Sequence, residues 1–124
     1  MKVTWNAQPD DHDYPAAAAY LALLADKPTV DSLVQKLRDA PISHQKAKDI
    51  LRASQLALLS KDNKHVAADL QKIEDGKDLS PILLVRGSFR TGAPLQVADG
   101  YHRVCASYWV DENTDIPVKL AGPE

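Results

Sequence analysis

The residue types best suited to chemistry lie together in the segment Asp99-Gly100-Tyr101-His102-Arg103. The apolar residues before it predict a strand and those after it a helix, so Gly100 stands where the backbone must turn sharply. The first turn of a helix presents unpaired N–H groups at the positive end of its dipole. Because an arginine can bind two oxygens of a phosphate or carboxylate at once, the segment predicts an anion site with His102 and Arg103 as donors.

A second interpretation of the same segment stays open. In this interpretation, Arg103 forms a salt bridge with Asp99, Asp111 or Glu112, and His102 has a structural role. Asp99 is then an Asp-Gly turn residue that caps the following helix. Local chemistry alone does not separate these two interpretations.

A second group of candidate ligands precedes the first expected helix. Asp10, Asp11, His12 and Asp13 carry carboxylates and an imidazole, which are suitable ligands for a divalent cation. Consecutive side chains point in different directions, however, and acidic residues also favour the start of a helix. A solvated helix cap is therefore the competing interpretation.

The elements that must position these residues follow from apolar spacing and from turn residues. An N-terminal helical hairpin is expected, with a first helix over 14–25 and a second that starts at Lys27 and stops before Pro41. From residue 46 the expected order is strand, helix, strand, strand, helix, strand. The expected ranges are 49–53, 64–75, 81–85, 95–98, 102–110 and 116–120.

Length and composition exclude several classes of protein. A chain of 124 residues with 44% hydrophobic and 26% charged residues predicts one folded domain. The formal net charge of −2 makes binding to the phosphates of DNA unexpected. One cysteine, Cys105, forms no internal disulfide. Neither a membrane-spanning segment nor a signal peptide is recognised, so a cytoplasmic location is expected.

The C-terminal two thirds resemble the ParB/sulfiredoxin-like family. The resemblance covers about residues 46–121 and includes the segment 59–76 that leads to the Pro81-Ile82 strand. Its motifs are Pro81-Ile82-Leu83-Leu84-Val85, Val97-Ala98-Asp99-Gly100-Tyr101-His102-Arg103, and Ile116-Pro117-Val118.

This resemblance implies an α+β fold with a small mixed sheet and helices over 46–121, preceded by a helical extension over 1–45. It also implies that the turn at Gly100, Tyr101, His102 and Arg103 binds nucleotide phosphates. Lys64 and His65 begin the helix that faces this turn in the family, which implies a second phosphate contact or a proton carrier at one of them. The competing interpretation makes them an exposed helix start. The expected ligand is ATP, ADP or CTP with Mg²⁺.

The sequence also departs from the family in informative ways. Sulfiredoxins carry a catalytic cysteine where this chain has Tyr101, so sulfinic-acid reductase activity is not expected. ParB proteins continue into a helix-turn-helix region, whereas this sequence ends at Glu124, so centromere binding is not expected either. The Asp-Gly-x-His-Arg pattern is closer to family members that are small-molecule kinases, which makes Asp99 the candidate catalytic residue for phosphotransfer or nucleotide hydrolysis.

A function from another class remains as the alternative. In it the domain is a non-catalytic interaction module, and the helical hairpin over 14–39 supplies the surface for a protein partner or a second copy. An apolar stripe left exposed on that hairpin would favour this function.

Overall fold

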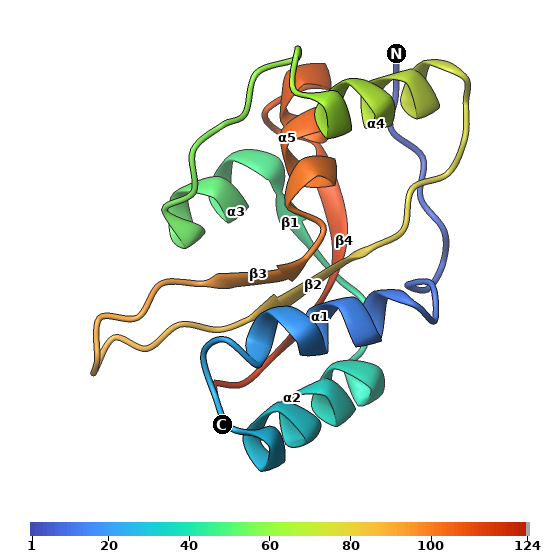
Figure 1. Cartoon of the computed structure of the whole chain (residues 1–124). Coiled ribbons are helices and arrows are strands. Elements are labelled where there is room, and N and C mark those ends of the chain that lie inside the picture. The colour runs from blue at the N-terminus through green and yellow to red at the C-terminus, as the bar shows by residue number, and fades with distance from the viewer. Residues whose placement is uncertain (124) are drawn as a thin grey trace.

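A four-stranded mixed sheet in the order β1-β4-β2-β3 lies at the centre of the computed structural model, which describes residues 1–123 (Figure 1). Strand β4 is parallel to β2 and antiparallel to β1, and β2 is antiparallel to β3. The small mixed sheet expected from the sequence is therefore confirmed. The strands are β1 (Ser43–Lys46), β2 (Ile82–Val85), β3 (Gln96–Asp99) and β4 (Asp115–Ala121).

Helices cover both faces of this sheet. The N-terminal hairpin of α1 (Asp13–Leu21) and α2 (Lys27–Asp39) packs on one face, and α3 (Ala47–Ser54) and α5 (Tyr101–Val110) lie over the other (Figure 1). Helix α4 (Lys64–Glu74) packs against α5. This arrangement confirms the α+β fold with an N-terminal helical hairpin. No helix within residues 1–123 has the length and apolar character needed to cross a membrane.

The sequence of strand β2 is apolar without interruption because both faces of the strand are buried. All four of its residues are buried, and alternate side chains enter two different cores. Ile82 and Leu84 join the core under α3, α4 and α5, whereas Leu83 and Val85 join the core under α1 and α2. A strand covered on both faces loses the polar alternation of a half-exposed strand.

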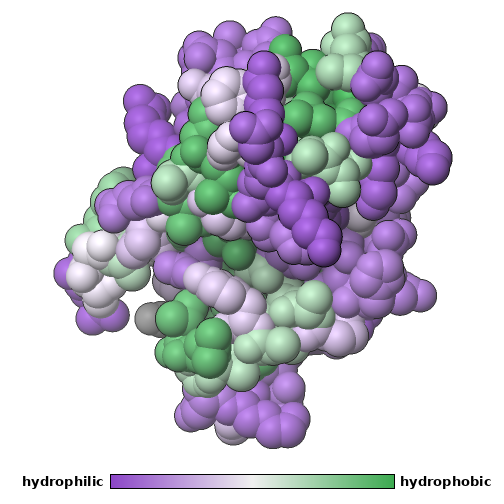
Figure 2. Space-filling model, turned by 45° about the horizontal axis from the view of Figure 1, so that its top comes forward, coloured by the Kyte–Doolittle hydropathy of each residue, from purple (hydrophilic) through white to green (hydrophobic). Residues whose placement is uncertain are grey.

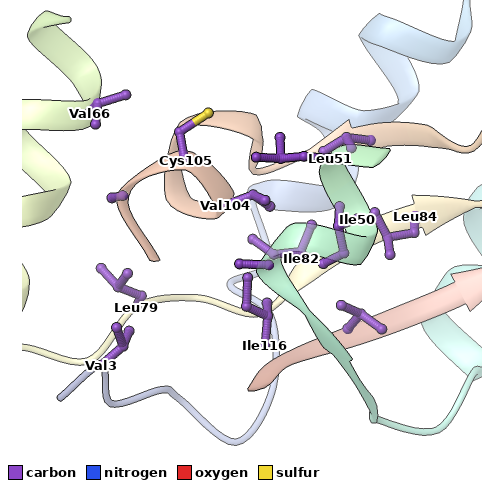
Figure 3. Close-up of a cluster of buried hydrophobic side chains, with 14 of the residues drawn as sticks. Val3, Ile50, Leu51, Val66, Leu79, Ile82, Leu84, Val104, Cys105 and Ile116 are labelled. Atoms are coloured by element: carbon purple, nitrogen blue, oxygen red, sulfur yellow. The ribbon is translucent and has the colours of Figure 1, made fainter. Parts of the chain in front are cut away.

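The larger core gathers side chains from most of the chain (Figure 3). Val3 and Leu79 extend it to the N-terminal segment, where Trp5 forms an isolated bridge with Leu79. Cys105 is fully buried in this core and has a free thiol. It thus packs as a small apolar side chain in this fold.

The strand expected over 49–53 is wrong, because these residues belong to α3. The buried residues of α3 are Ala47, Ile50, Leu51 and Ser54, which have the i, i+3, i+4, i+7 spacing of one helical face. The strand instead lies at Ser43–Lys46, a polar edge strand with no apolar alternation. Strand β1 crosses the boundary expected between 45 and 46, and it belongs to the sheet.

The other elements differ from expectation only at their ends. The first helix ends at Leu21 rather than residue 25, because residues 22–24 form a turn. Asp26 begins α2 by accepting a hydrogen bond from the Thr29 amide, and Gly76 follows α4 with a φ of 74°. A glycine after the last helical turn is a common stop signal.

Packing of the helical hairpin on the sheet can be tested at Leu37. This side chain is 0% exposed in the core between α2 and the sheet. We expect Leu37→Ala to lower the free energy of unfolding by about 2–5 kcal/mol in urea titrations, because it leaves a cavity. The control Leu23→Ala removes a side chain that is 81% exposed and should change stability by less than about 0.5 kcal/mol. Equal effects of the two substitutions would contradict this packing.

Candidate functional site

A polar cleft of about 410 Å³ lies where the N-terminal segment, α4 and the start of α5 meet. Its polar lining contains five aspartates, three histidines, one lysine and one arginine. Carboxylates therefore outnumber the permanently charged cations around the cleft. The charged and histidine residues are Asp10, His12, Asp13, His65, Asp69, Lys72, Asp78, Asp99, His102 and Arg103.

Arg103 holds three segments together at the base of this cleft. Its guanidinium donates to Asp99 at 2.5 Å and to the carbonyl oxygens of Ser80 and Pro81 at 2.5 and 3.3 Å. A carboxylate oxygen of Asp13 lies 3.6 Å away. The side chain is 14% exposed, so these contacts are mostly shielded from water. The interpretation in which Arg103 pairs with Asp99 is the one observed.

Ser80 links the N-terminal segment to the same group. Its hydroxyl donates to the buried Asp13 carboxylate and accepts a hydrogen bond from the Asp10 amide at 3.1 Å. Its carbonyl oxygen meanwhile accepts from Arg103. Ser80, two residues before β2, thereby fixes the start of α1 against the start of α5.

Gly100 produces the turn from β3 into α5. Its φ of 110° favours glycine, and a Cβ atom there would lie 2.4 Å from a methyl carbon of Ile82. The start of α5 has no side-chain cap, and its first residues line the cleft. The first-turn N–H groups of Tyr101, His102 and Arg103 thus carry the positive end of the helix dipole toward polar space.

Two histidines from different helices lie side by side near this helix start. The ring centroids of His65 on α4 and His102 on α5 are 4.7 Å apart. Burial lowers the pKa of His102 below its usual value, the neighbouring His65 lowers it further, and Asp69 opposes both effects. Within residues 1–123, neither imidazole forms a hydrogen bond with the protein. Both imidazoles therefore keep donors and acceptors for a ligand.

Burial also raises the pKa values of two carboxyl groups of the cleft, those of Asp69 and Asp99. It raises the pKa of Asp69 by more than the combined lowering by Lys72, Arg103 and the two histidines. Burial also raises the pKa of Asp99, and the nearby Asp13 carboxylate adds to the increase, so the pKa stays above its usual value although Arg103 and His12 lower it. Negative charge is thus costly on these residues.

The structure brings most of the expected site residues together. Gly100, Tyr101, His102, Arg103 and His65 line the cleft, as does Asp99, whereas Lys64 does not. The sequence reasoning missed Asp69, Lys72, Asp78 and Ser80 as cleft residues. The spacing of His65 and Asp69, four residues apart on one helix, could have indicated that they share a face.

Asp10, His12 and Asp13 form the other feature of the cleft. One ligand atom from each lies within 4.8 Å of the others, a spacing that a bound cation would require. The competing interpretation, a solvated helix cap, is wrong, because no side chain caps α1 and Asp13 is buried. Asp13 is buried and is engaged by Ser80 and Arg103, while Asp10 and His12 are exposed. Asp11 is outside both the group and the cleft lining.

Comparison with models of protein families, with curated proteins and with solved structures gives no match to this chain. The resemblance to the ParB/sulfiredoxin-like family therefore rests on the sequence motifs alone.

The contacts of Arg103 predict how the stability of a single variant differs from that of a double variant. Arg103→Met should lower the free energy of unfolding by about 3 kcal/mol, because it leaves partly buried carboxylates without their cation. Adding Asp99→Asn to this variant should recover part of the loss, since one of those charges is then removed. Urea titrations of the single and double variants measure both effects. A double variant less stable than Arg103→Met would contradict this account.

Removing the charge of Asp69 is expected to stabilise the protein at neutral pH. Because its folded-state pKa is raised, the folded protein favours the neutral carboxyl, and ionisation at neutral pH destabilises it. Asp69→Asn should therefore raise the melting temperature at pH 7, and its advantage should shrink as the pH falls toward 4. Thermal melts across this range measure the change, with the exposed Asp62→Asn as control. A lower melting temperature for Asp69→Asn at pH 7 would refute the prediction.

Proposed function

We propose that the polar cleft binds a phosphate-bearing small molecule of the nucleotide class at the N-terminus of α5. The observation that carries this proposal is the uncapped start of this helix, which lines the cleft beside two histidines without protein hydrogen bonds. Helix N-termini bind phosphates because their N–H groups and dipole favour negative charge. Gly100 supports the function by permitting the sharp turn that places the start of α5 at the cleft.

The cleft residues take different parts in this proposal. The N–H groups of Tyr101, His102 and Arg103 and the imidazoles of His65 and His102 are the donors to phosphate. The Arg103 side chain has a positioning role, because its contacts with Asp99 and two carbonyl oxygens hold the start of α5 in place. Direct contact between the Arg103 side chain and phosphate is not part of this arrangement.

The excess of carboxylates requires a cation beside the phosphate. Five aspartates would repel an anion more than Lys72 and Arg103 attract it, so the ligand binds as a complex with a divalent cation such as Mg²⁺. Asp10, His12 and Asp13 are the residues that would hold this cation, with the two carboxylates as its preferred ligands. A bound cation would screen the cleft charges from the phosphate.

The proposed function is binding, and catalysis is a separate question. Phosphotransfer needs a carboxylate or base that orients the attacking group. Asp99 is the candidate, but one of its oxygens accepts from Arg103, which favours a positioning role. In an assay with small hydroxyl acceptors, Asp99→Asn that abolishes turnover while nucleotide binding persists would establish the catalytic role.

Two neighbouring alanines on α4 provide a matched test of the binding site. Ala67 and Ala68 are both exposed, but only Ala68 lines the cleft. Ala68→Glu adds a like charge beside the phosphate and should weaken binding about tenfold, since two charges several ångströms apart interact by about 1–2 kcal/mol at a protein surface. Ala67→Glu should leave binding unchanged.

Calorimetric titrations with ATP, ADP and CTP in the presence of Mg²⁺ measure these affinities. The absence of binding by all three nucleotides would overturn the proposal. Equal affinities for the two glutamate variants would show that a nucleotide binds elsewhere on the protein.

A second candidate function is an interaction surface on the helical hairpin. Leu23 and Leu24, in the turn after α1, are 81% and 58% exposed, and Tyr20 beside them is 38% exposed. Figure 2 shows that hydrophobic residues gather in separate patches on an otherwise largely hydrophilic face. Light scattering after size exclusion at several concentrations tests self-association, which Leu23→Ser with Leu24→Ser should abolish.

A further inference from the structure

A second cavity, of about 600 Å³, lies between α3 and the hairpin that joins β2 to β3. Figure 1 shows that this hairpin extends from the sheet on the side of α3. We propose that this cavity, here called the hairpin groove, binds a small apolar carboxylic acid of the fatty-acid class, with its carboxylate at Arg86. The hairpin groove and the polar cleft share no lining residue, so the inference is independent of the proposed function.

The walls of the hairpin groove are mostly apolar. Leu84 of β2 and Ile50 of α3 are almost completely buried and form its floor, and Leu120 of β4 lies beside them. Phe89, in the turn of the hairpin, is fully exposed on the rim. Small-molecule sites are concave, mostly apolar and about 300–1,000 Å³ in volume. The hairpin groove has each of these properties.

Backbone hydrogen bonds fix the shape of the hairpin groove. The Leu95 amide donates to the Ala53 carbonyl at 3.1 Å and thereby joins the hairpin to the end of α3. The Arg86 amide donates to the Ala121 carbonyl at 2.8 Å, which joins the hairpin to β4. Because both walls are held before a ligand arrives, binding orders little of the protein and costs little conformational entropy.

Arg86 provides a cation that no group of the protein uses. Within residues 1–123, its guanidinium forms neither a hydrogen bond nor an ion pair. Asp49, the acidic residue of the lining, lies 3.4 Å from Arg52 instead. A guanidinium can bind both oxygens of one carboxylate. An apolar molecule with a single carboxylate therefore matches both the walls and the charge of the groove.

The charge of the surrounding segments also selects the ligand. Residues 43–55 and 86–95 form most of the walls, and they contain five of the 15 basic residues but one of the 17 acidic residues. This local excess of positive charge attracts an anion and repels a cation. It also opposes a second copy of the chain at this site, because a symmetric dimer would bring two surfaces of the same charge together.

The experiment compares decanoate, decan-1-ol and decylammonium, which share one alkyl chain and differ in the charge of the head group. The protein labelled with ¹⁵N is titrated with each compound at pH 7.5, below the concentration at which micelles form. At this pH the carboxylate is ionised and the amine is protonated. Proton–nitrogen correlation spectra report the affinity and the residues whose signals shift.

We expect the affinity of the wild-type protein to fall in the order decanoate, decan-1-ol, decylammonium, with at least an about tenfold difference between the first and the last. Signals of residues 49–55 and 86–95 should shift, and those of residues 99–103 should not. Arg86→Gln should lower the affinity for decanoate toward that for decan-1-ol, which should itself stay unchanged. Lys36→Gln, which removes an exposed cation on α2, should retain the preference for decanoate.

Two exposed alanines on different helices test the location of the ligand. Ala53 on α3 lines the hairpin groove, whereas Ala67 on α4 does not. Ala53→Glu adds a negative charge and a longer side chain to the wall, so it should weaken decanoate binding about tenfold. Ala67→Glu should leave this binding unchanged. Far-ultraviolet circular dichroism confirms that each variant is folded.

Four results would overturn the inference, and each is measured on the wild-type protein. Equal affinities for decanoate and decylammonium would show that charge does not select the ligand. Absence of binding by all three compounds would leave the groove to a partner protein, and shifts confined to residues 99–103 would place the compounds in the polar cleft. A dimer in light scattering that Ala53→Glu dissociates would show that a second copy fills the groove. The proposed function is tested separately, because none of these titrations contains a nucleotide.

Discussion

The burial of two like charges beside each other is the constraint on which the cleft depends. Asp99 and Asp13 come from the end of β3 and the start of α1, and each carboxylate lies within 3.6 Å of the Arg103 guanidinium. Without a cation between them they would repel each other in a region that water reaches poorly. Arg103 also satisfies two carbonyl oxygens before β2, so one side chain fixes the relative positions of three segments.

This constraint explains why the helix start remains available. The N-cap of α5 is Gly100, which has no side chain, and the Asp99 carboxylate before it is held by Arg103, so the expected capping of this helix by Asp99 is wrong. The left-handed conformation of Gly100 brings the backbone close to Ile82 and Arg103, which leaves no room for a side chain. The start of α5 can thus bind an anion because Arg103 neutralises the carboxylates of Asp13 and Asp99 next to it.

Much of the fold could be predicted because its signals are local. The buried run of β2, the helix after Gly100 and the start of α2 at Lys27 each depend on a few adjacent residues. Strand β1 could not be predicted, because its polar sequence adopts an extended shape only through pairing with β4. The apolar residues Ile50 and Leu51 of α3 were misassigned, since a short apolar cluster suits a strand as well as a helix.

The candidate site was harder to foresee than the fold. The segment 99–103 was identified because glycine, histidine and arginine carry chemical meaning in sequence. The contributions of Ser80 and Asp13 depend on contacts between residues 67 positions apart, and no periodic pattern records such a contact. Whether a charged side chain faces a ligand or a structural partner is likewise decided by the tertiary fold.

The order of the strands has a consequence for synthesis of the protein. Strand β4 lies between β1 and β2 and pairs with both, yet it follows both of them in the sequence. While the ribosome is still making residues 1–114, β1 lacks its partner and β2 lacks one of its two neighbours. The sheet therefore closes only after β4 has left the exit tunnel, and until then the nascent chain exposes strand edges that a chaperone can recognise.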